Sequence, residues 1–147
     1  MAIRLSTGCR TGMANSSGLR EQFEGGFIGV YSGGQPANAD AAETGVLLVT
    51  IATTSGTGAA DGIGFGTAAA GQLPKSAPVW SGVVGVGGVA GYFRLWDINK
   101  TTGSNSTARR IDGNVGVSGS DMVLSNTTLA EGATLTIDQG TFEEPAS

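Results

Sequence analysis

Residues 91–98 read Gly-Tyr-Phe-Arg-Leu-Trp-Asp-Ile and form the most aromatic stretch of the chain. Side chains of a β-strand alternate between its two faces, so Phe93 and Leu95 share one face while Tyr92 and Trp96 share the other. A large apolar or aromatic side chain therefore stands on each face. The period of two predicts a strand, and it also raises the question of what covers its second face.

The segment 27–31 repeats this pattern, with Ile28 and Val30 on one face and Phe27 and Tyr31 on the other. A two-layer sandwich buries one face of each strand. The large rings on the second face are then either exposed or covered by a helix or a loop. Exposed aromatic side chains that lie together are typical of a binding interface. The sequence leaves both alternatives open.

Six more stretches have strand-like alternation or lie between turn residues, namely 46–54, 63–67, 80–89, 111–117, 122–124 and 135–137. No long helical pattern separates these strands, so a parallel fold of alternating strands and helices is not expected. The sequence predicts an all-β fold, a jelly-roll-like antiparallel β-sandwich of about eight short strands with one short N-terminal helix. A small barrel is the alternative.

The helix is expected shortly after residue 16, where Ser16 or Ser17 supplies a cap and Leu19 and Phe23 lie four residues apart on one face. Residues 1–16 are predicted to be an N-terminal arm or an edge segment. Residues 17–142 are predicted to form a single β-sandwich domain, and residues 143–147 a solvated tail. A length of 147 residues is typical of one domain.

The composition excludes several kinds of chemistry. The chain has no histidine and one cysteine, so His-dependent triads, His-ligated zinc and an internal disulfide are excluded. Its 8 basic and 12 acidic residues give a net charge of −4, which disfavours nucleic-acid binding. We find no bilayer-spanning apolar run and no secretory signal pattern. We therefore expect synthesis in the cytoplasm, with no nucleic-acid or membrane partner.

Three motifs suggest a ligand or catalytic site, but each has a plainer explanation: a strand or turn for the first two and an unpaired thiol without a role for the third. Residues 85–90 match a loose dinucleotide pattern, yet a strand follows where a helix is required. Residues 97–103 begin like a calcium loop but lack its glycine and glutamate. Cys9 lies near Arg4 and Arg10, which would lower its pKa, although a catalytic thiol lacks a histidine partner here.

Two acidic pairs are candidates for general acid–base groups, namely Asp112 with Asp121 and Glu43 with Asp61. Twelve carboxylates in loops and strand ends always offer some such pair. We assign no catalytic, cofactor-binding or metal-ligating residue and no cofactor, and we expect the protein not to be an enzyme.

Several segments resemble small structural proteins of tailed bacteriophages and prophages, namely 3–8 (Ile-Arg-Leu-Ser-Thr-Gly), 18–23 (Gly-Leu-Arg-Glu-Gln-Phe), 28–33 (Ile-Gly-Val-Tyr-Ser-Gly), 35–42 (Gln-Pro-Ala-Asn-Ala-Asp-Ala-Ala), 47–48 (Leu-Leu), 91–94 (Gly-Tyr-Phe-Arg) and 126–137. Within that class the chain is most similar to small capsid decoration, or cement, proteins. The resemblance covers most of the chain in style and residue order and includes no diagnostic motif, so it transfers no binding residue.

The resemblance implies a virion component that is made in the bacterial host cytoplasm and lies on the capsid exterior. It would bind the major capsid protein, stabilise the shell and self-associate into a homo-oligomer. A tail, neck or adaptor protein of the virion is the first alternative. A carbohydrate-binding module that stacks sugars on Trp80, Tyr92 or Trp96 is the second. The residues expected at the interface come from the N-terminal arm and one aromatic face: Ile3, Leu5, Met13, Phe27, Tyr31, Tyr92 and Trp96.

Overall fold

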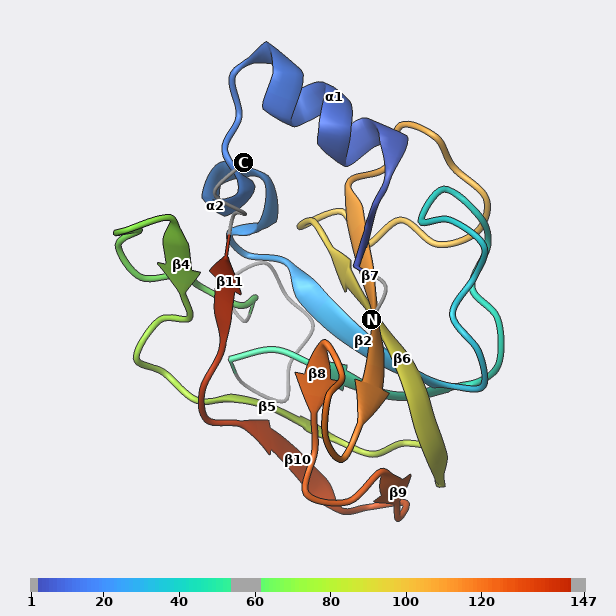
Figure 1. The fold of residues 1–147 in the computed structure, drawn as a ribbon. Helices are drawn as coiled ribbons and strands as arrows, with labels where there is room; N and C mark the ends of the chain where they lie inside the picture. Colours follow the sequence, from blue (N-terminus) through green and yellow to red (C-terminus); the bar gives the residue numbers. More distant parts are fainter. Residues whose placement is uncertain (1–2, 54–61, 144–147) are drawn as a thin grey trace.

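A mostly antiparallel sheet around the long strand β6 (Gly88–Trp96) forms one layer of the protein (Figure 1). The structure is a computed structural model that describes residues 3–53 and 62–143. Its order is β1-β7-β6-β2-β3, with β8 beside β7 and β9 beside β6. The bounds are Arg4–Leu5 for β1, Phe27–Ser32 for β2, Leu47–Ile51 for β3, Arg110–Gly116 for β7, Met122–Val123 for β8 and Thr128–Leu129 for β9.

Two strand pairs form the opposite layer. β5 (Trp80–Val83) pairs with β10 (Thr134–Ile137), and β4 (Gln72–Pro74) pairs with β11 (Thr141–Glu143). The main core lies between the layers and takes side chains such as Ile28, Phe93 and Leu95 from the large sheet and Trp80 from β5. The predicted all-β sandwich is confirmed. The jelly-roll connectivity stays a prediction.

Two helices, α1 (Thr7–Asn15) and α2 (Leu19–Phe23), lie together at one end of the sheet (Figure 1). The sequence predicted α2 but not α1. The side chain of Ser6 caps α1 by accepting a hydrogen bond from the amide of Cys9 at 3.1 Å. α2 begins after Gly18 and has no side-chain cap, so the predicted cap at Ser16 or Ser17 is wrong.

Residues 3–16, the described part of the segment predicted as an arm or edge segment, are docked on the domain. β1 is an edge strand paired with β7, and Ser6 joins α1 to the same strand. The Ser6 hydroxyl donates to the Ala108 carbonyl at 2.8 Å and accepts from the Arg110 amide at 2.9 Å. Gly8 lies so close to this strand end that a Cβ there would be 2.2 Å from the Thr107 carbonyl oxygen, so only glycine fits.

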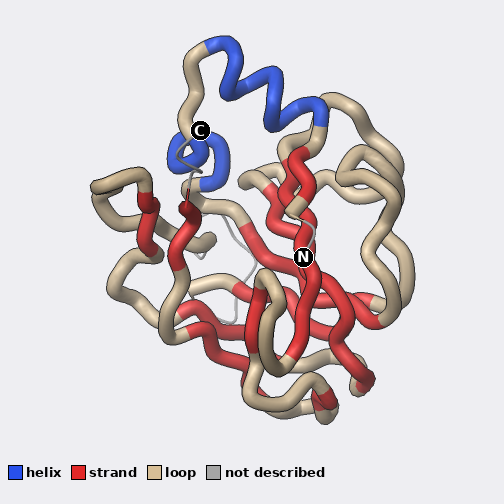
Figure 2. The backbone as a smooth tube through the Cα atoms, viewed as in Figure 1, coloured by secondary structure: helices blue, strands red, loops and turns tan. Residues whose placement is uncertain are grey.

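Two loops cover the face of the large sheet that points away from the sandwich core. Residues 33–46 join β2 to β3, and residues 97–109 join β6 to β7; both run along the same side of the molecule (Figures 1 and 2). Under them lies a second buried cluster of Phe27, Tyr31, Ala52, Tyr92 and Trp96. The central part of the sheet, in β2 and the second half of β6, is therefore buried on both faces.

Two strand predictions need correction. Residues 63–67 form only isolated bridges, in which Ile63 pairs with Gly26 and Phe65 with Lys75. The segment 80–89 is not one strand, because β5 ends at Val83 and β6 begins at Gly88. Thr54, Asp61 and residues 144–147 of the predicted tail lie outside the described residues, whereas Glu143, its first residue, is the last residue of β11.

Candidate functional site

The aromatic residues expected on an exposed face are buried. Phe27, Tyr31, Tyr92 and Trp96 have relative exposures of 5% or less. The rings of Tyr31 and Tyr92 stack with centroids 5.0 Å apart, and Trp96 packs edge-on against Tyr31. The expectation that these four side chains form a contact surface is therefore corrected, because the loops enclose them. Trp80 is buried as well, so none of the three rings considered for sugar stacking offers an exposed platform.

The tyrosine hydroxyl of Tyr92 ties one covering loop to the sheet. It donates to the carbonyl of Thr44 at 2.8 Å and accepts from the amide of Thr44 at 2.9 Å. Lys100, from the other loop, places its ammonium nitrogen 5.6 Å from the centre of the Trp96 ring. The two loops thus contact the aromatic cluster through polar and cation–π interactions, which a hydrophobic sequence pattern does not reveal.

A buried network of charges lies beside the aromatic cluster. The guanidinium of Arg94 binds Asp112 through two hydrogen bonds, from Nε at 2.7 Å and from Nη2 at 2.8 Å. Its Nη1 donates to Glu43 and to the carbonyl of Ala41, both at 3.0 Å. Burial lowers the pKa of Arg94, but hydrogen bonds and charge from Asp112 and Glu43 outweigh burial and hold the pKa above its ordinary value.

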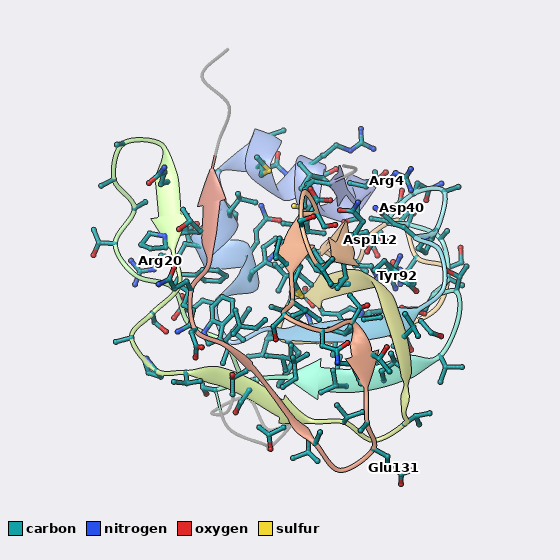
Figure 3. The ribbon with its side chains drawn as sticks, turned by 60° about the horizontal axis from the view of Figure 1, so that its bottom comes forward. Arg4, Arg20, Asp40, Tyr92, Asp112 and Glu131 are labelled. Atoms are coloured by element: carbon teal, nitrogen blue, oxygen red, sulfur yellow. The ribbon has the colours of Figure 1, made fainter. Side chains whose placement is uncertain are left out.

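Arg110 connects the second loop to the same network. It donates from Nη2 to the carbonyl of Thr101 at 2.7 Å, and from Nη1 to the carbonyls of Ala39 and Ala41. Figure 3 shows Asp40, Tyr92 and Asp112 on one side of the molecule, with Arg20 on the other. The arginine side chains of the network thus hold the backbone of both covering loops, 33–46 and 97–109, on the sheet.

Glu43 couples stability to pH. Desolvation raises its pKa, but the Gly103 amide at 2.9 Å and the Arg94 guanidinium outweigh desolvation, so the folded pKa lies below the ordinary 4.5. A lowered folded pKa stabilises the fold above the unfolded value, and this stabilisation is lost as pH falls through the folded value.

We expect Glu43→Gln to lower the free energy of unfolding at pH 7 by about 1.5 kcal/mol, because it removes a charged hydrogen-bond acceptor. The difference from the unmodified protein should shrink as pH falls below about 4.5. Urea unfolding at pH 7, 5, 4 and 3 measures this difference in unfolding free energy, and Glu131→Gln, at an exposed position, is the control. A difference that stays unchanged down to pH 3 would contradict this role of the ionised carboxylate.

Three of the predicted interface residues come together at an apolar cavity. Ile3, Leu5 and Met13 line a partly open cavity of about 600 Å³, which also receives Leu19 and Met122. Ile3 and Met13 are exposed, and Leu5 is half-buried. The sequence placed these three residues in one segment, and the structure adds the cavity beside them.

A second apolar surface is one that the sequence analysis missed. We call it the valine end; it consists of Val46, Leu47, Val83, Val86 and Val89. It lies where β3 and β6 begin and β5 ends. The carbonyl of Leu48 accepts hydrogen bonds from the amides of Gly85 at 2.9 Å and Val86 at 3.4 Å, which holds the β5–β6 turn against the start of β3.

The sequence does contain a signal for this turn. Gly85, Gly87 and Gly88 surround Val86, and glycine clusters of this kind are typical of turns. Within such a turn Val86 is no longer a strand residue with a buried face, and its side chain is 47% exposed. Reading 80–89 as one strand hid this surface.

The remaining motifs follow their plain interpretations. Asp97 accepts a hydrogen bond from the amide of Asn99 at 3.1 Å, which is a local turn. Asp112 binds Arg94, and Asp121 accepts from the Asn114 amide at 3.1 Å. Cys9 is buried, and burial raises its pKa to about 11 although Arg109 and Arg10 act in the opposite direction. The expected lowering of that pKa is corrected.

In residues 3–53 and 62–143 no group of three or more histidine, cysteine, aspartate or glutamate side chains is placed to hold a metal ion. No helix within these ranges has the length and apolar character to span a bilayer. The chain matches no protein-family model, no curated protein and no solved structure in the three comparisons made.

Proposed function

We propose that this protein is a non-enzymatic structural protein of tailed-bacteriophage virions, a capsid decoration protein that binds the lattice of the major capsid protein on the capsid exterior and stabilises the shell. The observation that carries this proposal is the valine end, an exposed apolar surface built by backbone hydrogen bonds at one end of the sheet. Exposed apolar surfaces of this kind mark protein–protein contacts.

The position of the valine end supports a docking role. Val46 and Val89 are 51% and 57% exposed. Val46 directly precedes β3 and Val89 lies in β6, and both strands are adjacent to β2 in one sheet. The amide of Ser32, at the end of β2, donates to the carbonyl of Val46, and Ser32 is paired with Ala90 of β6. The surface is therefore fixed before any partner binds, and little conformational entropy is lost on docking.

The area required is small for a protein of this size. A typical specific interface takes about 800 Å² from each partner, roughly a ninth of the 7240 Å² that the protein exposes. The chain also has few charges, and this favours repeated packing in a symmetric shell. In a highly charged protein, repulsion between like charges at the contacts would recur at every copy. Self-association into a homo-oligomer on the shell remains part of the proposal.

The test compares Val86→Lys and Val89→Lys with the unmodified protein in binding to capsids that lack it. Each substitution places a charge in the proposed interface, and we expect at least a tenfold loss of affinity. Ile98→Lys is the matched control, because Ile98 is 50% exposed and follows the opposite end of β6. Bound copies are counted by sedimentation, and capsid melting is followed by calorimetry.

Two results would overturn the proposal. One is the absence of binding and of any shift in capsid melting with the unmodified protein. The other is equal binding by the three variants, which would remove the valine end from the interface. Labelling of intact virions with an antibody locates the protein independently. A signal at the tail or neck would replace the capsid role by the tail, neck or adaptor role.

A further inference from the structure

The apolar cavity lies between the two layers of the sandwich and is partly open. Ile28, Phe93 and Ile111 of the large sheet line it, and Ile137 of the opposite layer does so too. In the described residues β1 and β8 pair only with β7, and β10 pairs only with β5. The sheet edges on either side of the cavity are thus not joined to each other, which leaves the opening.

The size and lining of the cavity suit a small apolar ligand. Its volume of about 600 Å³ lies within the roughly 300–1,000 Å³ of small-molecule sites, which are mostly apolar with a few polar groups. Polar side chains enter the lining at Asp121, Gln139 and Thr141. A ligand with a long apolar part and a small polar head matches this distribution.

The charges of the lining select the kind of head group. Among the described residues that line the cavity, Asp121 is the one ionisable side chain, and lysine and arginine are absent. An anionic head would meet a carboxylate and find no cation, so a fatty carboxylate is disfavoured. Trp80 also lines the cavity, and its buried indole N–H has no hydrogen-bond partner in the described residues. A hydroxyl oxygen can accept from such a donor.

From these observations we infer that the cavity binds a linear alkyl chain with an uncharged hydroxyl head group, the chemistry of a medium-chain alcohol. The alkyl chain lies among the isoleucine and phenylalanine side chains, and the hydroxyl is the only polar group that enters. The inference does not depend on the capsid role, because it concerns a different surface from the valine end.

The first experiment measures binding of 1-octanol, 1-decanol and decanoate to the full chain at pH 7 by displacement of the neutral fluorescent probe N-phenyl-1-naphthylamine. Each buried methylene contributes about 0.8 kcal/mol, so decanol should bind about 15-fold more tightly than octanol. Decanoate should bind at least tenfold more weakly than decanol. Equal affinity for the two alcohols, or tighter binding of decanoate, would overturn the inference.

The second experiment uses Met122→Lys, which places a cation at a half-buried position of the lining. We expect it to weaken decanol binding at least tenfold and to reduce or reverse the preference for decanol over decanoate. Val117→Lys is the matched control, because Val117 is exposed and is not among the lining residues. Urea unfolding of both variants verifies that they remain folded. A Met122→Lys protein that is folded and binds both ligands like the control would overturn the inference.

A second copy of the chain is the competing occupant. In that case probe binding would fall as protein concentration rises, and sedimentation would show a dimer that Met122→Lys dissociates. These two results together would show that a second copy of the chain, and not an alcohol, occupies the cavity. Failure of the capsid-binding test alone would leave the alcohol-binding measurements unaffected, so the two proposals fail separately.

Discussion

Replacing Arg94 by methionine should lower the free energy of unfolding by about 3–5 kcal/mol, because it leaves the buried Asp112 carboxylate without its partner. Both side chains are fully buried, and two hydrogen bonds of 2.7 and 2.8 Å join them. The substitution also removes the donors that hold Glu43 and the Ala41 carbonyl of the covering loop. Such a loss is a large part of the roughly 5–15 kcal/mol by which domains are stable.

Urea unfolding followed by circular dichroism measures this loss. Arg20→Met is the matched control, because the Arg20–Glu24 pair is also an arginine–carboxylate pair but both side chains are about half exposed. An exposed pair of this spacing contributes about 0.3–0.5 kcal/mol, so the control should remain close to the unmodified protein. If both variants lost the same small amount, Arg94 would not hold a buried charge network.

Trp96→Ala should cost about 3–5 kcal/mol of unfolding free energy, as expected for a large aromatic side chain removed from a packed interior. Trp96 is 1% exposed and packs against Tyr31 and Lys100. It also lies so close to Gly29 that a Cβ on Gly29 would be 2.4 Å from the edge of the indole. The space beneath the loops is filled, and removing the ring leaves a cavity.

The same variant separates a packing role from a binding role. Trp96→Phe retains a ring and should recover most of the lost stability, with the unfolding midpoint as the measurement. Leu47→Ala is the control for an exposed apolar residue and should change stability by less than about 0.5 kcal/mol. A Trp96→Ala protein of unchanged stability that loses glycan binding would instead support the carbohydrate-binding alternative.

The strand pattern predicted the faces of the sheet correctly, since residue alternation depends only on the geometry of a strand. Ile28 and Phe93 enter the main core, while Phe27 and Tyr92 lie on the opposite face, as the period of two indicates. What covers that opposite face could not be predicted. The loops are held on that face by hydrogen bonds from Arg94 and Arg110 of the sheet to the backbone carbonyls of Ala41 and Thr101. Every residue has a backbone carbonyl, so the sequence does not indicate which ones accept such bonds.

Two other features were missed for physical reasons that differ. α1 has few apolar side chains and contains two glycines. Its cap at Ser6 is a local hydrogen bond, but the contacts that hold it on the sheet, from Ser6 to Ala108 and from Gly8 to Thr107, are tertiary. The valine end was missed because alternation of valine and glycine reads equally well as a strand and as a strand–turn–strand. The three N-terminal residues of the predicted interface lie together at the cavity, namely Ile3, Leu5 and Met13. Their role in an interface stays a prediction.

The covering loops have a consequence for hydrogen exchange and for chain insertions. The amide of Asn105 donates to the carbonyl of Asp40 at 2.8 Å, and the amide of Gly103 donates to Glu43. Surface loops usually exchange fast and accept insertions. Here these amides should exchange as slowly as those of the strands, because exposing them requires opening a buried charge network. An inserted peptide in 33–46 or 97–109 would therefore disturb one whole side of the sandwich, and tags belong elsewhere on the chain.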